Sequence, residues 1–154
     1  MGNIIPYRYH HKKENIMENS YHYIMLINHS LYQKLVYDGL EGLSIGQPKV
    51  LDFLLEHDGC MQKEVAAGCF IEPATATSIL LKMENDGYIS RSARDGNRRS
   101  LYVFLTEKGR AAAEKVREVM KSAEEQALSQ LNESERETLL MLMKKVTGGL
   151  RQKD

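Results

Sequence analysis

The chain has 154 residues, of which 42% are hydrophobic and 27% charged, and its 21 basic side chains are balanced by 21 acidic ones. A chain of this length fits one domain, and none of its apolar runs approaches the roughly 20 residues that a membrane-spanning helix requires. Overall neutrality excludes a protein that coats nucleic acid or anionic lipid with its whole surface, although it permits one basic element on a neutral body.

Two amphipathic helices are predicted in the first third of the chain. Apolar side chains recur at helical spacing over residues 16–41, at Ile24, Ile27, Leu31 and Leu35. Ser44 and Gln47 have the spacing of a capping box, which predicts that the second helix opens at about Ile45. Gly59 ends this helix, whose buried stripe comprises Val50, Leu51, Leu54 and Leu55.

The next segment predicts two helices joined by a tight turn. The first covers residues 62–68, and a glycine-containing turn follows it. Pro73 then occupies the first position of a helix that extends to about Asp86, because the fixed φ of proline suits a helix start, and Gly87 ends it. The buried face of this second helix comprises Ala76, Ile79, Leu80 and Met83. Two helices joined in this way form a helix-turn-helix.

The periodicity then changes from helical to extended. Residues 88–91 and 100–105 are short β-branched and aromatic runs. Between them lies the arginine-rich stretch RSARDGNRRS, with Asp95 and Gly96 at its centre. We therefore predict a β-hairpin with a long loop.

Two long helices are predicted to close the chain. Thr106 caps the first, from about Glu107 to Ser129. Asn132 caps the second, with Glu135 completing a capping box. The apolar stripe of this last helix comprises Leu139, Leu142, Met143, Val146 and Leu150.

A helix-turn-helix followed at once by a two-stranded hairpin has the arrangement of a winged helix. The second helix of such a unit fits the major groove of DNA, and the hairpin tip lies over the neighbouring phosphates and minor groove. Arginine suits that tip because its planar fork matches phosphate and base-edge acceptors. Asp95 or Asn97 could accept a hydrogen bond from one guanidinium and hold it in position. We predict DNA contacts from the four arginines of this stretch, Arg91, Arg94, Arg98 and Arg99.

The outward face of the second helix supplies the other candidate DNA contacts. Its residues are hydroxylated or basic, namely Thr75, Thr77, Ser78 and Lys82. Hydroxyls bond phosphates and bases alike, so the DNA sequence that the helix would read does not follow from them. For the two threonines the alternative is a role in helix-start chemistry. Glu84 and Asp86 would oppose DNA unless they lie on the far side of the helix.

Three stretches, taken in order, resemble the MarR family of bacterial winged-helix regulators: LSIGQPKVL, MQKEVAAGCFIEPATATSILLKMENDGYISR and RDGNRRSLYVFLTEKGR. The resemblance implies a mainly α (α+β) fold in a single domain, 1–154, with a winged helix-turn-helix and small β-hairpin wing at about 43–107. Dimerisation helices would flank it at about 15–41 and 107–151. Two positions depart from the family pattern. Asn97 stands where aspartate often precedes the wing-tip arginine, and Ser78 where many members carry a basic residue.

The resemblance also implies a function. It implies a homodimer whose first and last helices intertwine. A cytoplasmic location is expected separately, because two cysteines do not make a disulfide framework. The resemblance further implies repression at a palindromic double-stranded operator with half-sites roughly 10 bp apart. A small aromatic or phenolic effector would enter the cleft between the dimer helices and the winged domain and release the DNA. The apolar stripes support the dimer from the residues alone, because they exceed what a small winged core could cover. The candidate effector contacts are Tyr21, His22, His29 and Tyr32.

Other chemistry has less support in the residues. Cys60 and Cys69 are expected to pack rather than to sense oxidant. The five histidines show no metal-ligand spacing with cysteine or carboxylates, so we expect neither metal nor cofactor. No nucleophile–base pair, phosphate loop or carboxylate pair predicts an enzyme. The alternative function is a winged-helix protein-interaction module without operator binding, which the net neutrality and the sparse charge of the second helix favour.

Overall fold

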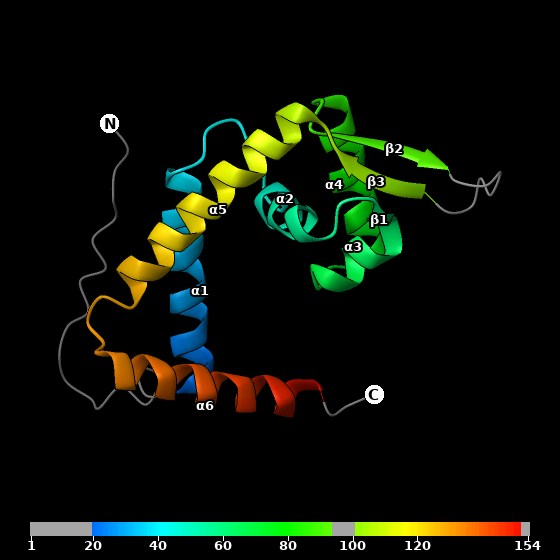
Figure 1. The fold of residues 1–154 in the computed structure, drawn as a ribbon. Helices are drawn as coiled ribbons and strands as arrows, with labels where there is room; N and C mark the ends of the chain where they lie inside the picture. The colour runs from blue at the N-terminus through cyan, green and yellow to red at the C-terminus, as the bar shows by residue number, and fades with distance from the viewer. Residues whose placement is uncertain (1–19, 94–100, 152–154) are drawn as a thin grey trace.

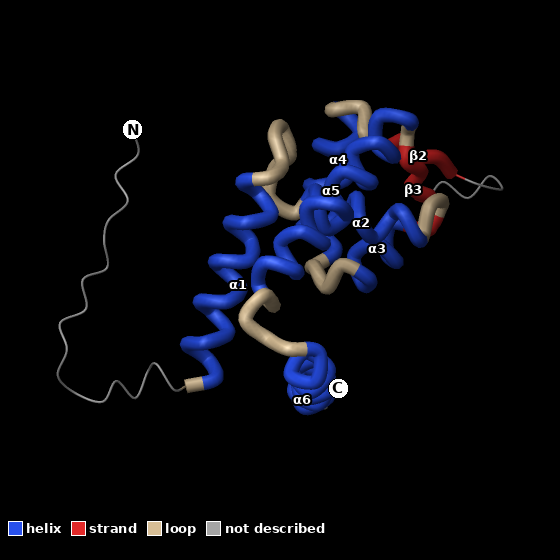
Figure 2. Tube along the Cα trace, turned by 60° about the vertical axis from the view of Figure 1, so that its left-hand side comes forward, coloured by secondary structure: helices blue, strands red, loops and turns tan. Residues whose placement is uncertain are grey.

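Helices dominate the secondary structure of the chain. The computed structural model describes residues 20–93 and 101–151, where the elements follow in the order α1, α2, β1, α3, α4, β2, β3, α5 and α6 (Figure 1). The elements from α2 to β3 gather at one end of the molecule, and α1, the far half of α5 and α6 form the other end (Figures 1 and 2). This mainly α architecture, with one small antiparallel sheet, confirms the predicted fold class.

The first helix, α1 (Tyr21–Asp38), begins later than residue 16, where the apolar periodicity had placed its start. Ser20 is its N-cap, with an extended backbone and a hydroxyl that accepts a hydrogen bond from the backbone N–H of Tyr23 at 3.1 Å. Serine is favoured at this position because its oxygen satisfies one of the free N–H groups of the first turn. Only the end of α1 enters the core, where Val36 is buried.

The second helix, α2 (Gln47–Glu56), begins two residues after the predicted position at Ile45. Gly46 precedes it with φ +89°, a left-handed conformation that cannot continue into a right-handed helix. The side chain of Gln47 still accepts from the backbone N–H of Ser44 at 2.8 Å, so this half of the predicted capping box is present. Pro48 lies in the first turn, as expected.

The hydrophobic core lies between α2, α4, α5 and the sheet. The stripes predicted for α2 and for the second helix of the helix-turn-helix both point into it, with Leu55 and Ile79 only partly buried. Because Leu51 and Leu54 are fully buried, truncating either to alanine would cost about 2–5 kcal/mol of unfolding free energy. The fully buried core side chains include Val50, Leu51, Leu54, Val65, Leu80, Met83, Val103 and Val116.

Three short strands form the sheet, in the order β1-β3-β2. β2 (Ile89–Ala93) and β3 (Leu101–Leu105) pair antiparallel, with Ile89 opposite Leu105 and Ala93 opposite Leu101, which confirms the predicted hairpin. β1 (Cys60–Met61) was not predicted, because two residues are too few for an alternating pattern to be visible. It adds to β3 through its pairing with Val103 and Tyr102.

The two closing helices begin at the predicted caps. The hydroxyl of Thr106 accepts from the backbone N–H of Gly109 at 3.0 Å and opens α5 (Glu107–Ala127), which ends two residues before Ser129. Before α6 (Glu133–Arg151), Asn132 and Glu135 form a reciprocal capping box, with N–H···O distances of 2.9 and 3.0 Å.

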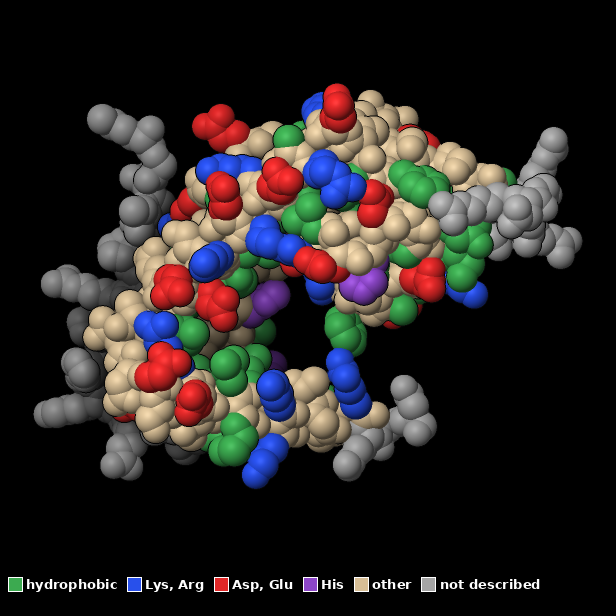
Figure 3. Space-filling view, in the orientation of Figure 1, with side chains coloured by type: hydrophobic (Ala, Val, Ile, Leu, Met, Phe, Trp, Pro, Cys, Tyr) green, Lys and Arg blue, Asp and Glu red, His purple; other side chains and the backbone are tan. Residues whose placement is uncertain are grey.

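The apolar faces of α1 and α6 stay uncovered in the single chain. Leu31 on α1 is 58% exposed, and Leu142 and Leu150 on α6 are 49% and 71% exposed. An opening separates α6 from the elements above it in the space-filling view (Figure 3). The far end of α6 approaches them again, where the guanidinium of Arg151 lies 5.2 Å from the ring centroid of Phe70. No single described helix is long and apolar enough to cross a membrane, and α3 with α4 reaches that length only across a 114° bend.

Candidate nucleic-acid interface

The helix-turn-helix consists of α3 (Gln62–Gly68) and α4 (Pro73–Asn85). The turn between them is closed by backbone hydrogen bonds from Cys69 N–H to Val65 O at 2.9 Å and from Ile71 N–H to Ala66 O at 3.0 Å. The face of α4 that carries Ala76, Leu80 and Met83 is buried in the core. The opposite face is therefore directed outward. It carries all four predicted contact residues of this helix, Thr75, Thr77, Ser78 and Lys82, as exposed side chains.

Two of the three hydroxyls on this face already bond the helix itself. Thr77 Oγ1 donates to the carbonyl of Pro73 at 2.9 Å and accepts from Gln62 Nε2 at 2.8 Å. Ser78 Oγ donates to the carbonyl of Ala74 at 3.1 Å, one turn earlier. A hydroxyl that donates in this way keeps acceptor capacity, which suits a donor such as a base amino group better than a phosphate oxygen. The hydroxyl of Thr77 therefore joins α3 to α4.

Lys82 is the basic residue of the outward face of α4. Its ammonium lies 3.0 Å from the carboxylate of Asp86, four residues later, and its side chain is 53% exposed. The pKa of Asp86 lies below its ordinary value, chiefly because Lys82 donates a hydrogen bond to it. An exposed pair of this kind contributes little to stability and leaves the ammonium free to bind a stronger anion.

Arg91 lies in β2, the first strand of the wing, where the sequence predicted an extended run. Its side chain is only 12% exposed. Nη2 lies 2.6 Å and Nε 3.0 Å from Glu84 Oε2, and Nη1 lies 3.3 Å from Gln62 Oε1. The carboxylate of Glu84 thus contacts the wing strand. Its pKa lies below the ordinary value because of the hydrogen bond from Arg91.

The remaining residues predicted for the wing tip lie outside the described part of the chain. They are Arg94, Asp95, Asn97, Arg98 and Arg99. Their roles as DNA contacts and as wing support stay predictions. The described structure supplies the base of the wing, because β2 and β3 are paired up to Ala93 and Leu101.

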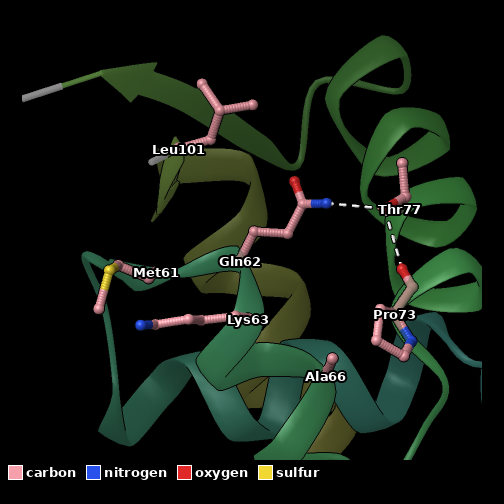
Figure 4. A pocket seen from close by; sticks show the side chains of 7 residues that line it. All are labelled: Met61, Gln62, Lys63, Ala66, Pro73, Thr77 and Leu101. Atoms are coloured by element: carbon pink, nitrogen blue, oxygen red, sulfur yellow. Dashed lines mark hydrogen bonds between the residues drawn. The ribbon is translucent and has the colours of Figure 1, made fainter. Parts of the chain in front are cut away.

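A pocket of about 260 Å³ opens between the helix-turn-helix and the base of the wing (Figure 4). The side chain of Gln62 crosses it toward Thr77, and Leu101 of β3 lies above (Figure 4). The arrangement is a polar face of one helix beside the base of an antiparallel hairpin, with a shallow hollow between them. The pocket is lined by Met61, Gln62, Lys63, Ala66, Pro73, Thr77 and Leu101.

Known proteins are similar to this chain in sequence and in structure. A model of the MarR family matches residues 43–101. The transcriptional regulator BilQ of Clostridium symbiosum is 29% identical over 106 residues, which cover 69% of this chain and 74% of that protein. A crystal structure of a probable transcriptional regulator from Pseudomonas aeruginosa has a TM-score of 0.77 at 27% identity, covering 84% of this chain and 98% of that one. The chain is therefore similar to the MarR family over its winged helix-turn-helix.

Two further solved structures share the fold of this chain and carry bound molecules. The Staphylococcus aureus protein MepR, in a complex with DNA, has a TM-score of 0.77 at 24% identity and covers 86% of this chain and 99% of that one. The Mycobacterium tuberculosis MarR-family protein Rv2887, in a complex with salicylic acid, has a TM-score of 0.64 at 24% identity and covers 82% of this chain and 96% of that one. At these identities the likeness concerns the fold.

The predicted effector contacts lie on α1, and they line neither the 260 Å³ pocket nor a second pocket in the described part of the chain. Tyr21, His22 and His29 are exposed on α1. The hydroxyl of Tyr32 donates to the carbonyl of Met120 on α5 at 3.4 Å, and burial raises the pKa of its phenol. A pocket of about 390 Å³ is lined by other residues, including Leu40, Leu43, Tyr88 and Lys115. The effector assignment of the four residues stays a prediction.

The two cysteines pack as predicted. Cys69 is buried and its thiol donates to the carbonyl of Lys49 at 3.7 Å, and burial raises its pKa to about 11. Cys60 is half-buried in β1, and burial raises its pKa as well. Neither thiol has the depressed pKa that a reactive cysteine needs.

Gln62 is the interface residue that sequence reasoning missed. It bonds Thr77, 15 residues away, and Arg91, 29 residues away, so no local spacing in the sequence marks it. The one available signal was its place at the start of the first helix of the predicted helix-turn-helix. A polar side chain there lies next to the second helix once the motif folds.

Proposed function

We propose that this protein is a transcriptional regulator that binds double-stranded DNA as a homodimer and represses transcription from a palindromic operator. The observation that carries the proposal is the exposed polar face of α4 beside the paired base of the β2–β3 hairpin. A helix presented in this way fits the major groove, and the hairpin reaches the adjacent backbone. Support for this function over an enzymatic one comes from the transcriptional regulator BilQ and from the MepR–DNA complex, to which the chain is similar.

A second copy of the chain would cover the apolar faces of α1 and α6. Large side chains on both helices are 36–71% exposed, and a monomer seldom leaves such continuous apolar faces in water. In a two-fold dimer two copies of α4 would enter major grooves about one helical turn apart, roughly 10 bp. This spacing is what makes a palindromic operator the expected target.

A small aromatic or phenolic acid is the proposed effector. Support comes from Rv2887, a MarR-family protein whose structure contains salicylic acid. Tyr21, His22, His29 and Tyr32 are proposed to contact the effector between the dimer helices and the winged domain, where a second chain would complete the site. The effector would release DNA only if it binds the DNA-incompetent arrangement more tightly.

The test begins with selection of bound fragments from genomic DNA. The recovered duplex is then titrated with the protein at several salt concentrations. We expect a palindromic site and an affinity that falls steeply with salt, because phosphate neutralisation releases counterions. Arg99→Ala should weaken binding markedly while leaving the dimer folded, and Lys34→Ala, on the exposed face of α1, is the matched control. Recovery of a protein partner together with no duplex binding would instead favour an interaction module.

A further inference from the structure

The wing strand and the last turn of α4 are joined by one pair of side chains. Arg91 of β2 donates through Nε and Nη2 to Glu84 Oε2, at 3.0 and 2.6 Å. The backbone N–H of Arg91 donates to the other carboxylate oxygen, Oε1, at 3.1 Å. The carboxylate of Glu84 therefore contacts both the main chain and the side chain of Arg91. Such a multiple, charge-assisted contact fixes direction as well as distance.

The same guanidinium also reaches the first helix of the helix-turn-helix. Its Nη1 donates to Gln62 Oε1 at 3.3 Å, and Gln62 Nε2 donates onward to Thr77 Oγ1 at 2.8 Å. Thr77 lies on the outward face of α4 and donates to the carbonyl of Pro73 at 2.9 Å. The chain of contacts Glu84–Arg91–Gln62–Thr77 thus starts and ends on α4 and passes through β2 and α3.

We propose that this chain of contacts is a brace that sets the angle of the wing against α4, and that Arg91 and Glu84 are positioning residues for DNA binding rather than DNA contacts. The proposal rests on the proposed function. Arg91 is 12% exposed, and all three of its guanidinium nitrogens have protein partners within hydrogen-bond distance. Three of its five N–H donors are thus engaged within the protein, and little of the side chain is open to a phosphate.

Because Arg91 lies near the end of β2, the brace affects the direction in which the wing leaves the sheet. Arg91 is opposite the buried Val103 of β3, so its backbone is held by the sheet on one side and by Glu84 on the other. Arg94 follows three residues later, within about 11 Å of extended chain. The direction in which the strand leaves the sheet therefore governs where the wing arginines can go.

The substitution Glu84→Gln distinguishes a positioning role of Glu84 from a purely electrostatic effect of its charge on DNA binding. Removing a negative charge near DNA strengthens binding when charge alone matters. Glutamine has the size of glutamate, but its amide carries N–H donors, so it cannot accept the full set of donors from Arg91. The brace predicts the opposite sign, namely weaker binding by about tenfold. Arg91→Lys keeps the charge and loses the fork, and it should weaken binding to a similar extent.

The experiment measures the affinity of the selected operator duplex by fluorescence anisotropy for the parent, Glu84→Gln, Arg91→Lys and Glu72→Gln. Glu72 is an exposed carboxylate at the N-cap of α4 without a side-chain capping bond, so it is the matched control and should bind as tightly as the parent or more tightly. Each variant is also combined with Arg99→Ala. In a braced wing, Arg99→Ala should cost much less in the Glu84→Gln background than in the parent, because the wing is already misplaced.

Unchanged or tighter binding by Glu84→Gln, or additive effects of Glu84→Gln and Arg99→Ala, would overturn the brace while leaving the proposed function intact. Absence of duplex binding by the parent itself would overturn both. Thermal melting identifies a variant that does not fold. Should Glu84→Gln be such a variant, Arg91→Lys and its combination with Arg99→Ala decide the question by the same two criteria.

Discussion

Gly109 lies so close to Tyr88 that a Cβ on this glycine would be 1.8 Å from the Tyr88 carbonyl oxygen. The same carbonyl accepts from the backbone N–H of Thr106 at 3.0 Å and from its hydroxyl at 3.1 Å. It therefore cannot move away without disrupting the start of α5. We expect Gly109→Ala to lower the free energy of unfolding by at least about 2 kcal/mol, measured by urea denaturation.

Gly148→Ala is the matched control for that substitution. A Cβ at Gly148 in α6 has no other atom within 4 Å, so alanine should raise stability by up to about 1 kcal/mol through its better helix propensity. An unfolding midpoint of Gly109→Ala equal to that of the parent would contradict the close contact between Gly109 and Tyr88.

The exposed apolar faces of α1 and α6 predict a dimer that polar substitutions dissociate. Leu31→Ser together with Leu142→Ser should shift the protein to monomers in sedimentation velocity, because both side chains are about half exposed in the single chain. Ile45→Ser is the control, since Ile45 is 83% exposed but lies on neither helix. Equal sedimentation of the double variant and the parent would exclude these faces from the interface.

The thiol of Cys69 should be almost inert in the folded protein. Burial raises its pKa to about 11. At pH 8 its thiolate fraction is then on the order of one in a thousand, so we expect alkylation at least about 100-fold slower than in the unfolded chain. Mass spectrometry after timed iodoacetamide treatment measures this rate, with the half-buried Cys60 as an internal comparison. Rapid modification of Cys69 in the native protein would argue against its burial.

The brace between Glu84 and Arg91 should be lost in acid. The hydrogen bond from Arg91 holds the pKa of Glu84 below the ordinary value of 4.5. A carboxylate with a depressed pKa contributes stability that is fully present above its unfolded pKa and is lost as the pH falls through its folded pKa. The melting temperature of the parent should therefore exceed that of Glu84→Gln at neutral pH. The two should converge below pH 4.5, and a difference independent of pH would exclude an ionic contribution.

Much of the fold could be predicted from the sequence because its signals are local. Asn132 and Glu135 stand three residues apart, and their reciprocal hydrogen bonds depend only on the backbone of one helix turn. Pro73 marks the start of α4 in the same way, and the apolar period identifies which face of that helix is buried. The uncovered stripes on α1 and α6 were also visible, because a periodic apolar face is a property of the sequence.

The sequence by itself determined the helices, the caps of the last two and the presence of a hairpin beside a helix-turn-helix. Only the tertiary structure decided what those residues contact. Arg91 contacts Glu84 and Gln62, β1 pairs with β3, and α2 begins after Gly46 rather than at Ile45. The reason is physical. Charge and periodicity are carried by each short segment, whereas the partner of a guanidinium depends on how two elements pack, which the residues of either element alone do not specify.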